Sequence, residues 1–103
     1  MIIVQGTFTV DPDTRDEYLA QSVEQMRISR SEKGCQEYVL ADDPREPGRV
    51  ILSERWDSRE DLYAHVSAIT ERREAASRRG DEPGLAPLDR EITIYEVTSA
   101  ESM

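Results

Sequence analysis

The strand-to-helix junction that decides the fold reads VILSERWDSREDL over residues 50–62. Apolar residues recur at alternate positions up to Trp56, so residues 50–56 are predicted to form a strand. Ser58 follows almost at once, with Asp61 three residues later in a capping-box position. The junction therefore predicts a strand that passes directly into a capped helix.

Downstream of the junction the pattern becomes helical and then alternates again. Leu62, Val66 and Ile69 fall at helical spacing and are predicted to form the buried stripe of this helix, which ends near Gly80. A loop rich in proline and glycine follows. Residues 90–98 then predict the last strand.

Upstream of the junction the same elements occur in the order strand, helix, strand. Turn residues crowd positions 42–48 and predict a hairpin loop, preceded by a strand over residues 35–41. Asp11 and Pro12 begin a helix that runs to Lys33, and residues 2–10 predict the first strand. The apolar residues at helical spacing in this helix are Leu19, Val23 and Met26.

The order of elements is β-α-β-β-α-β, which predicts an α+β fold of the ferredoxin-like kind. Right-handed crossovers place both helices on one face of a four-stranded antiparallel sheet. The strands carry apolar residues on both faces, and we interpret the uncovered face as the interface of a homodimer. We expect a single domain over residues 1–98 and a short tail over residues 99–103.

Composition excludes several classes of function. The chain has 103 residues, with 22 acidic and 13 basic side chains and a formal net charge of −9, which argues against binding to nucleic acid or to anionic membranes. No stretch is long and apolar enough to span a membrane, and the first residues lack the pattern of a signal peptide. A single cysteine, Cys35, and a single histidine, His65, permit neither an internal disulfide nor a zinc site of the Cys/His kind, and we expect a cytoplasmic protein.

The middle of the chain resembles the antibiotic biosynthesis monooxygenase (ABM) domains, a family of small dimeric α+β barrel proteins. The resemblance rests on a glycine-cysteine-x-x-tyrosine run, a proline-containing hairpin, a glutamate-x-tryptophan strand end, and a helix with leucine-x-x-histidine. The matching segments are KGCQEY (33–38), DPREPGR (43–49), SERWDSREDL (53–62) and AHV (64–66).

This resemblance implies a homodimer packed sheet against sheet, with a substrate cavity in each subunit between the sheet and the helices. It also implies oxidation of a small aromatic, quinol or anthrone-type substrate by O2, without metal, flavin or another cofactor. Such chemistry needs a dry, apolar site that removes a proton from a phenol or enol and stabilises the resulting anion.

Four side chains are candidates for this site. His65, which matches the family's histidine, is the predicted catalytic base; the alternative is a boundary histidine paired with Asp61 one turn earlier. Trp56 is the predicted wall for a flat substrate, with a core anchor as the alternative reading. Tyr38 and Phe8 are the remaining candidates for substrate contact, against the readings of a half-buried strand tyrosine and a core phenylalanine.

Two other functions fit the same sequence. One is a non-enzymatic dimeric module that binds a small ligand. The other, ranked lower, is haem binding or degradation. The haem-degrading relatives use an asparagine on the first strand, and this chain has no asparagine, so that Gln5 or Thr7 would have to replace it.

Overall fold

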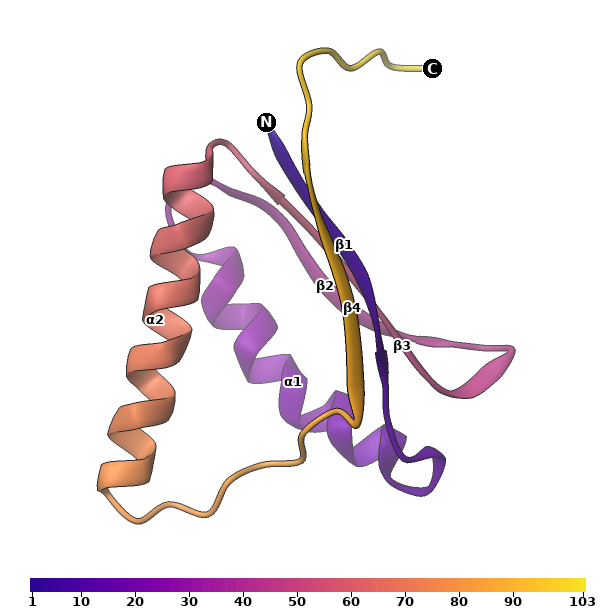
Figure 1. Cartoon of the computed structure of the whole chain (residues 1–103), viewed down its shortest axis with the longest axis vertical. Coiled ribbons are helices and arrows are strands. Elements are labelled where there is room, and N and C mark those ends of the chain that lie inside the picture. The colour runs from indigo at the N-terminus through magenta and orange to yellow at the C-terminus, as the bar shows by residue number, and fades with distance from the viewer.

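The computed structural model describes all 103 residues as four strands and two long helices. A single 3-10 turn, η1, precedes the first helix (Figure 1). In chain order the elements are β1 (Ile2–Thr9), η1 (Pro12–Thr14), α1 (Arg15–Arg30), β2 (Cys35–Asp43), β3 (Glu46–Trp56), α2 (Arg59–Arg78) and β4 (Asp89–Glu96).

The strands form one sheet in the order β2-β3-β1-β4, with every neighbouring pair antiparallel. Both helices lie on the same side of this sheet (Figure 1). The predicted ferredoxin-like α+β fold is therefore confirmed. The predicted capping of α2 is also confirmed, because the Ser58 hydroxyl accepts a hydrogen bond from the Asp61 backbone N–H at 3.1 Å.

The hairpin between β2 and β3 is tighter than the sequence predicts. The strands continue to Asp43 and from Glu46, so only Pro44 and Arg45 connect them, although the turn residues at positions 42–48 predict a longer loop. The pairing of β3 with β1 ends at Arg49, which pairs with Thr9, the last residue of β1. Pro47 is tolerated in β3 because it lies outside this paired part of the strand.

The core lies between the helices and the middle of the sheet. Residues paired across neighbouring strands share a face, so the register places Val4, Glu54 and Tyr38 in one row beneath the helices. The ten residues of the buried apolar cluster are Ile2, Val4, Val10, Tyr18, Tyr38, Leu40, Val50, Leu52, Trp56 and Leu62.

The helices bury only some of the residues predicted. Leu19 and Met26 of α1 are half-buried against the core, as expected. In α1, Val23 is exposed and the buried residues are Tyr18, Ser22 and Ser29. Both serine hydroxyls find partners within α1 (Ser22 donates to the Tyr18 carbonyl, and Ser29 accepts from Gln25), so their burial leaves no polar group unsatisfied. Hydrophobicity alone therefore identifies only part of the buried face of this helix and misses its serines.

In α2 the predicted stripe is only partly buried. Leu62 is buried and Ile69 half-buried, but Val66 is 50% exposed, and the second fully buried residue is His65. Val66 stays exposed because α2 packs against β3 and does not cover the edge strand β4 (Figure 1).

The edge strand β4 is consequently uncovered on the side that faces the helices. Ile92 pairs with Gly6 and Ile94 with Val4, so both isoleucines point toward the helix layer. They are nevertheless 46% and 43% exposed. Gly6 permits the close pairing here, because a Cβ at that position would overlap the backbone of Glu91.

The turn between α1 and β2 is tied to the start of α2 through Gly34. This glycine has φ +80°, and its carbonyl accepts a hydrogen bond from the Asp57 N–H at 2.8 Å. A Cβ at Gly34 would also overlap the Asp61 carboxyl group. The close contact between the turn and α2 thus requires glycine for two separate reasons.

We expect Gly34→Ala to destabilise the fold more than Gly80→Ala. Both glycines have positive φ, but nothing lies within 4 Å of a Cβ at Gly80. The backbone strain alone costs about 1–2 kcal/mol in either variant, and displacement of Asp61 adds about another 1 kcal/mol for Gly34→Ala. Urea unfolding of the two variants measures the difference, and equal losses would contradict the close contact.

Candidate active site

Three aromatic side chains from three elements meet beneath the N-terminal half of α2. The His65 ring lies 4.7 Å from the Trp56 ring and 5.2 Å from the Tyr38 ring, measured between centroids. His65 is 3% exposed and Trp56 is fully buried. The structure thus brings together three of the four side chains predicted for the site.

A glutamate from the turn after α1 binds the imidazole. His65 Nδ1 lies 2.6 Å from Glu32 Oε1, at the short end of hydrogen-bond distances. The alternative reading of His65 as a partner of Asp61 is not what the structure shows, because the Asp61 carboxyl lies against Gly34.

A second carboxylate lies on the other side of the ring. Glu54 Oε1 accepts a hydrogen bond from Trp56 Nε1 at 2.9 Å and lies 3.9 Å from His65 Nε2. Burial raises the pKa of Glu54, while the Trp56 indole N–H and the nearby His65 oppose that increase. The sequence carries a signal for this residue, because Glu54 alternates with Leu52 and Trp56 and must share their inward face.

The second ring nitrogen of His65 is free. Nε2 has no atom within hydrogen-bonding distance, since Glu54 at 3.9 Å is too far. Among fully enclosed side-chain nitrogen and oxygen atoms, only Arg15 Nε lacks a hydrogen-bond partner. His65 Nε2 is not such an atom, although the side chain as a whole is only 3% exposed.

Two tyrosines extend the site away from the imidazole. Burial raises the pKa of Tyr38 far above its ordinary value, and the charge of Glu54 raises it further. The pKa of Tyr18, a residue that the sequence analysis did not select, is also raised by burial, with opposing contributions from Arg90 and Arg73. Both phenols remain protonated at neutral pH and can act only as neutral hydrogen-bonding groups.

Phe8 lies apart from the other three candidates. It pairs with Val50 and Arg90, and the Arg90 guanidinium lies 5.8 Å from the Phe8 ring centroid. Phe8 is four positions after Val4, the β1 residue that pairs with Glu54. At the rise of a strand, the distance between these two positions along β1 is about 13 Å.

Exposed apolar side chains lie between the ring cluster and the edge of the sheet. Ile94 is in the same row as Val4 and Glu54, about 10 Å from Glu54 at the usual spacing of strands. On α2, Val66 lies on the same side as Arg73, whose charge acts on the buried Tyr18 and Tyr38. Val66 of α2 and Ile92 and Ile94 of β4 are thus exposed apolar side chains near the helix side of the sheet.

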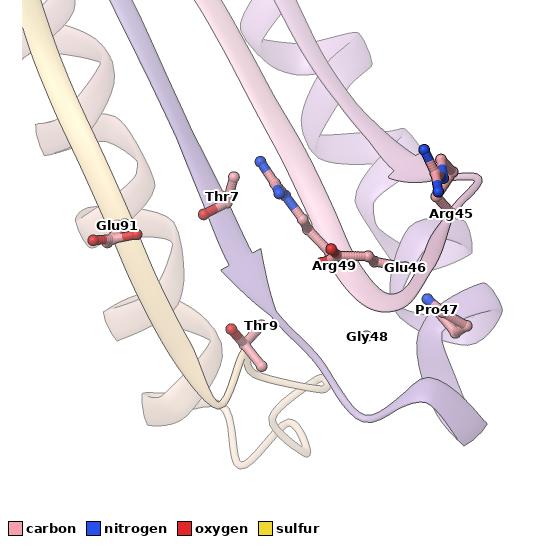
Figure 2. Close-up of a pocket in the computed structure, with 8 residues that line it drawn as sticks. All are labelled: Thr7, Thr9, Arg45, Glu46, Pro47, Gly48, Arg49 and Glu91. Atoms are coloured by element: carbon pink, nitrogen blue, oxygen red, sulfur yellow. The ribbon is translucent and has the colours of Figure 1, made fainter.

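The opposite face of the sheet is open and partly hollow. One hollow of about 760 Å³ includes Ile51 and Tyr95, both exposed. A second hollow of about 460 Å³ lies at the β2–β3 hairpin, where Arg45, Arg49, Glu46 and Glu91 surround it (Figure 2). Neither hollow reaches the ring cluster, which is on the helix side.

Neither α1 nor α2 has the length and the apolar character that a membrane-spanning helix needs. No group of three or more histidine, cysteine, aspartate or glutamate side chains is arranged to hold a metal ion.

The fold and the site together define a small ferredoxin-like α+β domain with a cluster of buried rings, in which one histidine lies between two carboxylates. The model of the family described as "Antibiotic biosynthesis monooxygenase" matches residues 1–78. The chain belongs to the antibiotic biosynthesis monooxygenase (ABM) family, whose members are generally small dimeric proteins.

Two curated relatives and several solved structures are similar to this chain. "Putative monooxygenase YcnE" of Bacillus subtilis is 28% identical over 89 residues, which cover 86% of this chain and 92% of YcnE. "Uncharacterized protein sll1783" of Synechocystis is 29% identical over 102 residues, 99% of this chain and 67% of the relative. A crystal structure of an ABM-type protein from Deinococcus radiodurans matches the fold with a TM-score of 0.78 at 24% identity, covering 100% and 98% of the two chains.

One structural neighbour is the haem degrader MhuD of Mycobacterium tuberculosis with two haems bound in its active site (TM-score 0.73, 13% identity, 99% and 100% coverage). The histidine site of the present chain does not fit haem. Axial ligation needs a macrocycle directly over Nε2, but the His65 side chain is only 3% exposed and the Glu54 carboxyl lies 3.9 Å from that nitrogen.

We expect Glu54→Gln to reduce the pH dependence of stability. The pKa of Glu54 is raised in the folded state, so the unfolded chain releases this proton at lower pH than the folded chain does. The free energy of unfolding should therefore fall as pH rises from the ordinary glutamate pKa through the raised one.

The glutamine side chain of this variant keeps an oxygen for the Trp56 N–H and has no proton to lose, so the fall should be smaller. Chemical unfolding at a series of pH values measures it. Glu17→Gln, on the exposed face of α1, is the matched control. Identical pH profiles for the wild type and Glu54→Gln would contradict the prediction.

Proposed function

We propose that this chain is the subunit of a homodimeric monooxygenase that oxidises a small phenol, quinol or anthrone-type substrate with O2, without a metal or organic cofactor. In this proposal His65 accepts the substrate proton at Nε2. The observation that carries the proposal is the free Nε2 of a buried imidazole that is bonded to a carboxylate through its other nitrogen.

The surroundings of His65 support a flat apolar substrate. Glu54 Oε1 is 3.9 Å from Nε2, so a substrate oxygen about 2.8 Å from Nε2 lies beside the Glu54 carboxyl, which can donate a hydrogen bond to it only in its protonated form. The carbon rings of a substrate bound this way would extend over Val66, Ile92 and Ile94, which no part of the chain covers. Flat rings and apolar side chains of this kind exclude water from the reacting oxygen.

The proposed reaction begins with proton transfer. The substrate O–H bond breaks, its proton moves to His65 Nε2, and the pair of electrons stays on the substrate as a phenolate or enolate. One electron passes to O2, and the resulting superoxide and substrate radical combine at carbon as a peroxide, which takes the proton back. Loss of water from the hydroperoxide then leaves a carbonyl group, so that one oxygen atom enters the product and the other enters water.

Trp56, Tyr38 and Phe8 take different parts in this proposal. Trp56 holds the imidazole from one side, and its N–H keeps Glu54 in place. Tyr38 is a neutral phenol that can donate a hydrogen bond toward a substrate oxygen. Phe8, remote from His65, could touch only the far end of a long substrate.

The open face of the sheet supports the homodimer. Exposed Ile51 and Tyr95 give this face an apolar centre, and the hairpin hollow combines two arginines with two glutamates (Figure 2). A two-fold axis brings the same patch together with itself, so a patch that carries both charges is self-complementary.

We expect His65→Gln to lower kcat by about 10²–10⁴-fold, the usual contribution of a general base. The measurement is O2 consumption by the purified protein with anthrone and quinol substrates. Tyr63→Phe, an exposed position on α2, is the control and should retain the wild-type rate.

The same assay separates the enzyme from a binding module. Wild-type turnover at the buffer rate, together with saturable binding of the substrate, would overturn the enzymatic proposal and favour a non-enzymatic ligand-binding protein. A fully active His65→Gln variant would remove His65 from the mechanism.

We expect Ile51→Asp to convert the dimer into an 11.8 kDa monomer, because it places a charge at the apolar centre of the open face. Sedimentation at micromolar concentration measures the mass. Leu88→Asp makes the same kind of change at an exposed apolar residue outside this face, just before β4, and should remain dimeric. A wild-type monomer would contradict the proposed dimer.

A further inference from the structure

Glu32 is held rigidly where it meets His65. Its backbone N–H donates to the Ser29 carbonyl at 3.1 Å, and its own carbonyl accepts from the Cys35 N–H at 3.2 Å. Two residues later, the Gly34 carbonyl accepts from the Asp57 N–H at 2.8 Å, which joins this turn to the beginning of α2. The turn that carries Glu32 and the helix that carries His65 are thus joined by backbone hydrogen bonds, which fix the two side chains relative to each other.

A neutral imidazole carries one proton, on either Nδ1 or Nε2, and only the nitrogen without it can act as a base. An ionised carboxylate accepts hydrogen bonds and donates none. With Glu32 Oε1 at 2.6 Å from Nδ1, the proton of the neutral ring belongs on Nδ1. The lone pair is then on Nε2, the nitrogen that has no hydrogen-bond partner.

We propose that Glu32 is the positioning residue of this site, which holds His65 in the Nδ1–H tautomer so that Nε2 is the proton acceptor. This inference rests on the proposed function for its catalytic meaning, although the tautomer itself does not. Nothing in the sequence near His65 identifies Glu32, which is 33 residues earlier in the chain.

The charges around the ring favour the same arrangement after proton transfer. The groups that face the imidazole are Glu32 from the turn, Glu54 from β3 and Tyr38 from β2. Once Nε2 has taken a proton, Glu32 stabilises the imidazolium at Nδ1, and the nearby Glu54 faces the newly protonated nitrogen. No cationic side chain forms an ion pair with either carboxylate, so both remain available to His65.

Nuclear magnetic resonance of the ring nitrogens tests the tautomer directly. The chain has one histidine, so a protein labelled with ¹⁵N-histidine gives one pair of ring signals that needs no assignment. In the neutral ring we expect a protonated Nδ1 and an unprotonated Nε2. A protonated Nε2 in the neutral wild-type ring would overturn the inference.

Variants of Glu32 test its role as the cause. Glu32→Gln should shift the neutral ring toward the Nε2–H tautomer, and with a turnover substrate it should lower kcat by about 10–100-fold with little change in KM. Glu32→Asp, which keeps the charge, should retain more of the Nδ1–H form and of the rate. Glu71→Gln, on the exposed side of α2, is the matched control and should change neither.

The two readouts keep this inference separate from the proposed function. A wild-type Nδ1–H tautomer that Glu32→Gln abolishes, in a protein without oxygenase activity, would support the positioning role and overturn the enzymatic proposal. An unchanged tautomer in folded Glu32→Gln would overturn the positioning role, whatever the activity. If Glu32→Gln fails to fold, the wild-type and Glu32→Asp spectra decide the question.

Discussion

The contact of His65 with the half-buried Glu32, beside the buried Glu54, is the constraint on which the rest of this structure depends. The long helix α2 fully buries only Leu62 and His65, so the Glu32–His65 bond and the stacking on Trp56 and Tyr38 determine where this helix lies. A hydrogen bond between an enclosed imidazole and a carboxylate adds little net stability, because desolvation of both groups offsets the attraction, but it specifies one geometry. That geometry places α2 over β3 and leaves β4 uncovered.

Uncovered apolar surface on both faces of one small sheet follows from this placement. Two helices cannot screen four strands, and the chain leaves Ile92 and Ile94 exposed toward the helices and Ile51 and Tyr95 exposed on the opposite face. We have proposed different occupants for the two surfaces, a substrate on the helix side and a second copy on the open side. The slightly low apolar content of the chain is consistent with a core that is completed by partners.

The sequence predicts the order of the elements, the Ser58 cap and the side chains that meet at the site, because these depend on local patterns and on motifs within the segments that resemble the family. It predicts the helix faces only in part. Leu19, Met26, Leu62 and Ile69 are buried or half-buried as expected, but Val23 and Val66 are exposed and Ser22, Ser29 and His65 are buried. Serines whose hydroxyls form hydrogen bonds within their own helix, and a histidine bonded to a carboxylate, can be buried although a hydrophobicity pattern does not select them. Glu54 could have been found from strand alternation, whereas Glu32 could not, because its contact is made only when the turn and α2 pack together.

The proximity of Trp56 to His65 has a consequence for optical spectroscopy. This is the only tryptophan of the chain, and its indole is fully buried against the only imidazole at 4.7 Å. The intrinsic emission of the protein therefore comes from the candidate site itself, with no background from other indoles. Protonation of the imidazole, or binding of an aromatic compound beside it, changes the immediate surroundings of this one indole. The tryptophan fluorescence of the protein therefore reports the state of the site.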